Sequence, residues 1–140
     1  MKVKEIVSTV EGIEISLKAD WTPKQANCLS KIKRALVGEY EDYMESVKAY
    51  DNARIKLVKE FAEKDKDGNP VFTDDNSSYK IVDTAGFRNK YEEKIKPLVD
   101  ELEEISNKEI DIKFDKFNID DFPKNCPAEA VYKMYALIED

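Results

Sequence analysis

No proline interrupts the chain between Pro23 and Pro70, and apolar residues recur there at steps of three and four. This spacing puts them on one face and predicts a single long helix over residues 23 to 64, about 60 Å long at the usual rise. Thr22 can cap its first turn, and Gln25 completes a capping box. The apolar stripe consists of Leu29, Ile32, Leu36, Tyr40, Tyr43, Val47, Tyr50, Leu57 and Phe61.

Two patterns precede this helix. Residues 3 to 10 carry apolar side chains at helical spacing and predict a short amphipathic helix, although their β-branched content leaves a strand open. The Glu11-Gly12 pair then interrupts the pattern. Apolar and polar residues alternate over residues 13 to 17, which predicts a half-buried strand.

A β-hairpin and a second helix are expected after the long helix. Residues 71–72 and 79–82 flank an Asp-Asp-Asn-Ser turn, which is typical of a short hairpin. The second helix should begin at about Thr84 with Asp83 as its cap. Pro97 lies inside it and should kink it, because proline removes one backbone hydrogen bond.

The last third of the chain completes the predicted fold. Alternation over residues 109 to 114 predicts another strand, and Pro127 opens a final helix to about Ile138. We therefore expect a single domain over residues 1–140 of the α+β class: a long antiparallel helical hairpin, a small mostly antiparallel sheet of three to four short strands and a short C-terminal helix. The part of the long helix before about residue 43 would extend beyond the second helix. The N-terminal segment, the last helix or a second chain should therefore cover its apolar stripe.

Composition excludes several function classes. Histidine is absent, which excludes His-dependent hydrolases, His-ligated zinc and His acid–base catalysis. Cys28 and Cys126 are too few for a structural zinc site and are expected to be reduced. The net charge of −7 argues against direct nucleic-acid binding, and no apolar run is long enough for a membrane span. Without a secretory signal, we expect a cytoplasmic protein that needs no cofactor.

The stretch EKDKDGNP at residues 63–70 raises the question of a calcium site. Counted from Glu63, its acids and glycine fill positions 3, 5 and 6 of a calcium loop. However, Asp74 at position 12 is too short for the usual bidentate ligand, and Pro70 is out of place. We interpret the stretch as a helix C-terminus with a glycine-containing turn. Weak cation binding by residues 63–74 stays open.

No catalytic or metal-binding residue is predicted, because neighbouring acids on a helix point in different directions. Aromatic residues are better candidates for protein contacts, since interfaces use tyrosine for large contact area at low entropic cost. The candidates are Trp21, Phe72 and the tyrosines at positions 40, 43, 50, 132 and 135, and core packing is the alternative for most of them. The predicted interaction residues are Trp21, Tyr40, Tyr43 and Tyr50, together with the acids Asp100, Glu101, Glu103, Glu104, Asp120 and Asp121.

Two long stretches carry a resemblance. They read KLVKEFAEKDKDGNP and YKIVDTAGFRNKYEEKIKPLVDELEEISNKEIDIKF, and a short acidic connector and a small helix follow them. This order resembles an uncharacterised family of small proteins encoded by phages and prophages of low-GC bacteria, whose long helix ends in an acidic Asp-x-Asp-Gly-Asn turn. Phe61 matches the aromatic residue that ends that helix, and residues 65 to 69 match the turn. Pro97 departs from the pattern. The resemblance implies a phage setting and no activity.

These features favour a non-enzymatic, phage-encoded protein that binds other proteins, either as a virion-assembly accessory or as an early host-directed factor. Its partner would be a phage structural protein or a host defence protein, with a homo-oligomer as a further option. The alternative is an anti-defence inhibitor of the anti-CRISPR kind, whose acids imitate nucleic-acid phosphates and block a bacterial immune nuclease. An enzyme that uses carboxylates with a metal ion is a third hypothesis.

Overall fold

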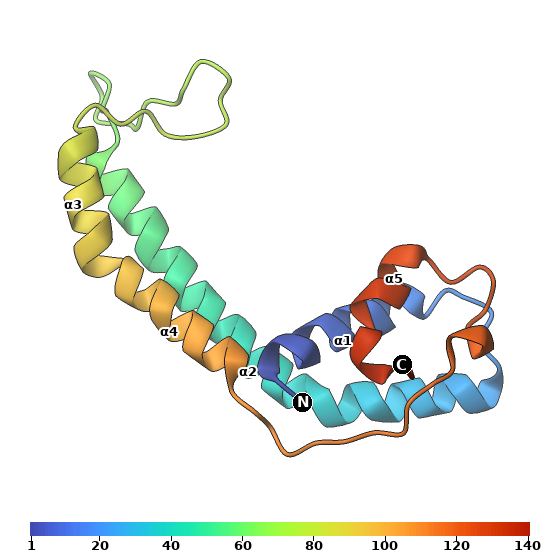
Figure 1. The fold of residues 1–140 in the computed structure, drawn as a ribbon. Coiled ribbons are helices and arrows are strands. Elements are labelled where there is room, and N and C mark those ends of the chain that lie inside the picture. The colour runs from blue at the N-terminus through green and yellow to red at the C-terminus, as the bar shows by residue number, and fades with distance from the viewer. The chain divides into compact units, whose positions relative to one another are not determined.

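The computed structural model describes residues 1–140 and is mostly helical (Figure 1). Short loops and extended segments connect five α-helices and two 3-10 turns. In chain order the elements are α1 (Val3–Ser16), α2 (Pro23–Phe61), α3 (Thr84–Lys94), α4 (Lys96–Asn107), η1 (Ile119–Asp121), α5 (Ala128–Lys133) and η2 (Tyr135–Leu137).

The α+β fold class predicted from the sequence is wrong, because the structure contains no sheet. Its extended residues meet only in isolated bridges, none of which continues into a ladder. The five bridges join Lys2 to Glu109, Ala62 to Ile81, Lys64 to Pro70, Phe72 to Tyr79 and Phe117 to Ile138. Extended pairs of this length lack the cooperative pairing and the shared apolar face that stabilise a sheet.

The chain divides into two compact units. The first, called the terminal unit here, contains residues 1–44 and 104–140. The second, the hairpin unit, contains residues 45–103. Helix α2 contributes to both, so no linker separates them along the chain. The single domain expected from the sequence stays a prediction.

Helix α1 overturns the predicted strand over residues 13 to 17. It runs from Val3 through Ser16 without a break, and Ile13 is fully buried on the same face as the buried side chains one and two turns earlier. Gly12 therefore does not end the helix. Instead it allows α5 to approach, since a Cβ at Gly12 would lie 2.7 Å from Met134 Cγ and 3.0 Å from the carbonyl oxygen of Ala130.

The core of the terminal unit forms where α1, the first half of α2 and the C-terminal elements meet. The N-terminal segment and the last helix thus cover the early stripe of α2, two of the three options that the sequence left open. Half-buried aromatic side chains, including Phe114 and Phe117, pack around the edge of this core. The buried cluster consists of Ile6, Val10, Ile13, Leu29, Ile32, Leu36, Ala130, Met134 and Leu137.

Local signals at the start of α2 act as the sequence predicts. The Gln25 backbone N–H donates to Thr22 Oγ1 at 3.2 Å, and the Thr22 N–H donates to Gln25 Oε1 at 3.0 Å. This reciprocal pair satisfies two backbone donors that a helix N-terminus otherwise leaves free. The Gln25 amide nitrogen also donates to the Asp121 carbonyl at 3.0 Å, which ties the connector after α4 to this end of the helix.

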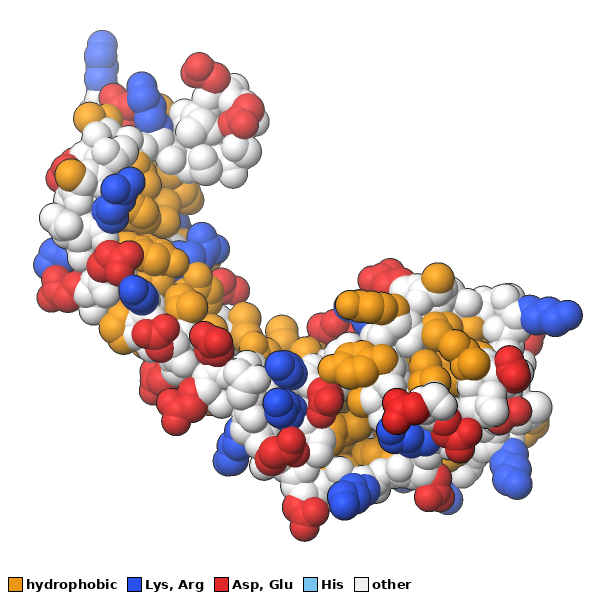
Figure 2. Space-filling model, viewed as in Figure 1, with side chains coloured by type: hydrophobic (Ala, Val, Ile, Leu, Met, Phe, Trp, Pro, Cys, Tyr) orange, Lys and Arg blue, Asp and Glu red, His pale blue; other side chains and the backbone are white.

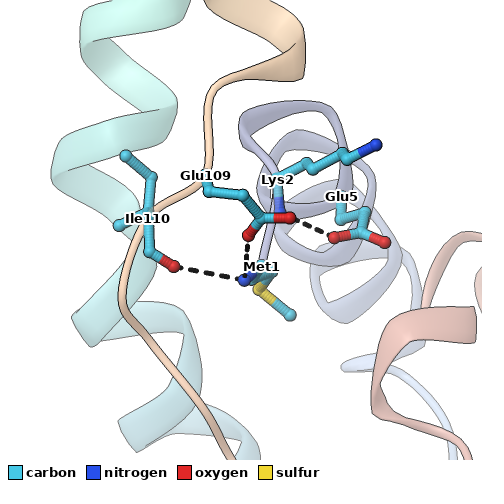
Figure 3. Close-up of polar contacts among 5 residues, drawn as sticks. All are labelled: Met1, Lys2, Glu5, Glu109 and Ile110. Carbon is cyan, nitrogen blue, oxygen red and sulfur yellow. Dashed lines mark hydrogen bonds and ion pairs between the residues drawn. The ribbon is translucent and has the colours of Figure 1, made fainter.

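The predicted strand over residues 109–114 is an extended segment without a partner strand. It begins beside the N-terminus, where the Met1 amino group donates to Glu109 Oε2 and to the Ile110 carbonyl, each at 3.1 Å (Figure 3). Ile110 and Ile112 turn inward onto the core of the terminal unit, which explains the alternation in the sequence. The alternation over residues 109–114 therefore arises because one side of a single extended segment is buried against the core.

In the hairpin unit, the second half of α2 runs beside α3 and α4 (Figure 1). The Phe61 and Phe87 rings meet edge to face with centroids 5.8 Å apart. Asp83 caps α3 by accepting from the Gly86 N–H at 3.0 Å. The expected kink at Pro97 is a break, because α3 ends at Lys94 and α4 starts at Lys96.

Candidate functional site

A groove opens in the hairpin unit between α2 and the loop over residues 62–82. It encloses about 370 Å³, at the small end of the range for binding pockets. One turn of α2 forms its floor, and the loop folds over as its second wall. We call this the loop groove; its lining residues are Arg54, Ile55, Val58, Phe72, Ser77, Ser78, Tyr79 and Ile81.

The walls of the loop groove are mainly apolar and remain open to solvent. Phe72 and Tyr79 face each other across an antiparallel bridge, with ring centroids 4.8 Å apart and planes tilted by 24°. Phe72 is 49% exposed, and Ile55 on the α2 side is 39% exposed. Large apolar side chains exposed around one concave surface are typical of a contact site for another molecule. Figure 2 shows apolar side chains following the paired helices of this unit.

Arg54 is the one charged residue that lines the loop groove. Its Nη2 atom lies 3.8 Å from Asp51 Oδ1, one turn earlier on α2. The two side chains are 43% and 47% exposed, so this contact is a long, solvated pair of small energetic value. The guanidinium keeps donors free for a second acceptor, because arginine carries five N–H groups.

A compact turn fixes the rim of the loop groove. The Asp75 carboxylate accepts from Thr73 Oγ1 at 2.6 Å, from Ser77 Oγ at 2.7 Å and from the Ser77 N–H at 3.1 Å. These donors lower the pKa of Asp75 from its usual 3.8 to about 2. Asn76 takes a left-handed conformation with φ of 55°, which asparagine tolerates better than most residues. The turn thereby holds Ser77 at the rim.

The acidic turn before the loop groove has a local structural role. Asp65 Oδ1 accepts the backbone N–H groups of Asp67 and Asn69, each at 2.9 Å. Gly68 has φ of +80°, a conformation that favours glycine. This turn does not end the helix, contrary to what the sequence suggested: α2 stops at Phe61, and the glycine turn lies beyond it, closed by the bridge between Lys64 and Pro70. Nowhere in the chain do three Asp, Glu, Cys or His side chains lie close enough together to hold a metal ion.

The predicted aromatic interaction residues do not gather at the loop groove. Trp21 packs into the terminal unit, where its Nε1 donates to the Ser16 carbonyl at 2.8 Å and its ring meets Phe122 edge to face at 5.1 Å. Tyr40 also packs against that core, and Tyr43 is half-buried on α2. A hydrogen bond with Tyr91 raises the pKa of Tyr50 and joins α2 to α3.

The predicted acidic residues are all exposed, and they belong to different units. Asp100, Glu101 and Glu103 lie on α4 in the hairpin unit. Glu104 is also on α4 but belongs to the terminal unit, as do Asp120 and Asp121 on η1. Asp120 donates its backbone N–H to Asn118 Oδ1 at 2.9 Å, which caps the 3-10 turn and leaves its carboxylate in solvent.

Sequence reasoning missed Ile55, Val58 and Ile81, although it included Phe72 among the aromatic candidates. Ile55 and Val58 lie one helical step beside the long stripe of α2, so the stripe broadens in the hairpin unit. This broadening is readable in the sequence as an apolar arc wider than one partner helix needs. The loop contribution was not readable, because long-range contacts such as the bridge between Ala62 and Ile81 place it.

A second cleft, of about 430 Å³, lies in the terminal unit between the extended segment after α4 and the C-terminal residues. It is lined by both signs of charge, including Glu5, Lys113, Lys116 and Asp140, beside Phe114. This mixed lining gives no preference for one class of ligand. The loop groove, with apolar walls and one cation, has the more defined chemistry.

Comparison with protein families, with curated proteins and with solved structures finds no match for this chain. The resemblance to a phage family therefore stays an expectation. None of the helices is both long enough and apolar enough to cross a bilayer.

Proposed function

We propose that this chain is a non-enzymatic interaction protein whose hairpin unit binds another protein chain at the loop groove. The observation that carries the proposal is the half-exposed apolar surface formed by Ile55 and Phe72 within a concave site. Removal of such side chains from water by a partner is favourable by about 25 cal/mol for each Å² of apolar area buried.

The chemistry of the loop groove suits recognition of a protein. The aromatic pair and the arginine belong to residue types that are enriched in protein interfaces, and the aliphatic side chains beside them add apolar contact area. The turn held by Asp75 keeps the rim in one conformation before binding. A preformed rim lowers the entropic cost of association.

The setting follows from the sequence resemblance. In this proposal the protein is phage-encoded and acts in the host cytosol, as a virion-assembly accessory or an early host-directed factor. Its partner is then a phage structural protein or a host defence protein. An inhibitor that mimics nucleic acid has less support, because lysines accompany its acids. Asp100, Glu101, Glu103 and Glu104 share α4 with Lys96, and α3 before it carries Lys90 and Lys94.

Capture from phage-infected cells tests this proposal. Tagged protein should retain specific protein chains, whereas the Ile55→Asp variant should lose them, because a charge on the groove floor opposes apolar contact. Val82→Asp is the matched control, since Val82 is 70% exposed in the same unit and lies outside the groove lining. Equal capture by the wild type and Ile55→Asp, with both proteins folded, would contradict the proposal.

A further inference from the structure

A single charged group, the guanidinium of Arg54, lines the loop groove. The acids of the rim turn, Asp74 and Asp75, are not among the lining residues. The Asp75 carboxylate already accepts three hydrogen bonds from Thr73 and Ser77. The groove is therefore positive at one point and neutral elsewhere, so charge complementarity favours an occupant that brings one negative group.

Asp51 leaves this guanidinium open to another acceptor. The Arg54 Nη2 atom lies 3.8 Å from Asp51 Oδ1, whereas a charge-assisted hydrogen bond is about 2.7–2.9 Å long. Both side chains are exposed and lie one turn apart on α2, and contacts of this kind contribute little to stability. A carboxylate from a partner can replace Asp51 with two parallel N–H···O bonds, a geometry that the planar guanidinium favours.

The apolar part of the groove begins directly beside this cation. Ile55 follows Arg54 on α2, and Val58 lies one turn further on, so the three side chains are neighbours about 5–6 Å apart. The stacked rings of Phe72 and Tyr79 form the wall on the loop side. An occupant that uses both features needs a negative group and a large apolar side chain within about one helical turn of each other.

The size of the loop groove favours an extended segment over a helix. Its volume of about 370 Å³ equals that of a cube about 7 Å on each side, whereas an α-helix with its side chains is about 10–12 Å across. In an extended chain, residues i and i+2 point to the same side and lie roughly 6–7 Å apart. This spacing matches the separation of the Arg54 position from the apolar lining.

We infer that the loop groove binds an extended peptide segment of the partner protein, in which an Asp or Glu lies two residues from a large apolar residue. The carboxylate pairs with Arg54, and the apolar side chain packs between Ile55 and the rings of Phe72 and Tyr79. Asp51 holds the guanidinium in the free protein and is replaced by the partner's carboxylate. The inference rests on the proposed function and adds to it the chemistry that the partner carries.

Selection on the full chain from a display library of random peptides tests the inference. Peptides that bind the wild type but not the Ile55→Asp variant should be enriched in an acid two residues from a large apolar residue. Fluorescence anisotropy of one such labelled peptide then measures its Kd. Arg54→Gln should raise the Kd about tenfold or more, because a charge-assisted contact is lost. Asp51→Asn should lower the Kd a few-fold, since the competing carboxylate is gone.

Arg88→Gln is the matched control, because Arg88 is exposed on α3 in the same unit and lies outside the groove lining. It should leave the Kd unchanged, and unchanged helical circular dichroism would show that all variants fold. Ile55-dependent peptides without a preference for acids overturn the inference, as does an Arg54→Gln variant that binds like the wild type. Weaker binding by Asp51→Asn overturns it as well, since the partner would then bring a cation.

Failure to select any Ile55-dependent peptide also overturns the inference. In each of these cases, Ile55-dependent capture of protein chains from infected cells leaves the proposed function intact, with a partner of other chemistry. Loss of that capture together with the peptide result contradicts both.

Discussion

Gly12 of α1 lies directly against Met134, the residue that follows the last turn of α5, so close that a Cβ at Gly12 would stand 2.7 Å from Met134 Cγ. Met134 is fully buried, and the Ala130 carbonyl oxygen lies 3.0 Å from the same point. Glycine in mid-helix usually costs about 1 kcal/mol relative to alanine. Here that cost permits the close packing of two helices around which the terminal unit is built.

Gly12→Ala should therefore destabilise the protein despite its better helix propensity. Overpacking a tight core costs about 1–3 kcal/mol, against a propensity gain of about 1 kcal/mol. We expect a net loss of up to about 2 kcal/mol in the free energy of unfolding. Urea unfolding followed by the fluorescence of Trp21, the single tryptophan, would measure it in the terminal unit.

Gly38→Ala is the matched control for that experiment. Gly38 also lies inside a helix of the terminal unit, but nothing stands within 4 Å of a Cβ placed there. The substitution should stabilise the protein by about 0.5–1 kcal/mol. If both glycine variants were stabilised, the close approach of α5 to α1 would be disproved.

Thr9 and Ser16, on one face of α1, should respond in opposite ways to loss of their hydroxyl groups. Both are fully buried, but Thr9 Oγ1 has no hydrogen-bond partner, whereas Ser16 Oγ donates to the Ile13 carbonyl at 2.8 Å. Thr9→Val removes an unsatisfied polar atom and should raise the free energy of unfolding by up to about 1 kcal/mol. Ser16→Ala removes a satisfied one and should lower it by about 1 kcal/mol. A Thr9→Val variant less stable than the wild type would show that the hydroxyl is bonded.

The sequence predicts helix ends well wherever the signal is local. The capping box of Thr22 and Gln25, the cap at Asp83 and the break before Pro97 each depend on residues within one turn of one another. Such contacts form with little help from the rest of the chain, so their residue types suffice to predict them.

The sheet was wrongly predicted because alternation of apolar and polar residues is not specific to β-strands; here it occurs in a helix and in a single extended segment. Over residues 13 to 17 the apolar residues alternate, yet Val3, Ile6, Val10 and Ile13 also follow helical steps that pass across Gly12. The contact with Met134, far along the chain, decides between the two patterns. In the same way, the loop groove depends on where a distant loop closes onto α2, which periodicity does not encode.

The rim of the loop groove should loosen in acid. The folded-state pKa of Asp75 is about 2, below its usual 3.8. The hydrogen bonds of the Asp75 carboxylate therefore stabilise the turn fully above about pH 4, and this stabilisation is lost as the pH falls through about 2. Amide hydrogen exchange at Ser77, corrected for the intrinsic pH dependence, should accelerate over this window. Asp75→Asn should accelerate it at neutral pH, whereas Asp74→Asn, one residue away, should not.

Salt dependence separates the proposed apolar interface from imitation of nucleic acid. A chain that replaces phosphates in a basic channel should lose affinity steeply between about 50 and 200 mM salt, because such contacts are electrostatic. The loop groove offers one cation and otherwise apolar or neutral walls, so a partner bound there should change affinity only weakly over the same range. Titration calorimetry of the captured partner at both salt concentrations would measure the difference. Replacing Asp100, Glu101 and Glu103 by the matching amides should leave that affinity unchanged, and a large loss would favour the acidic surface instead.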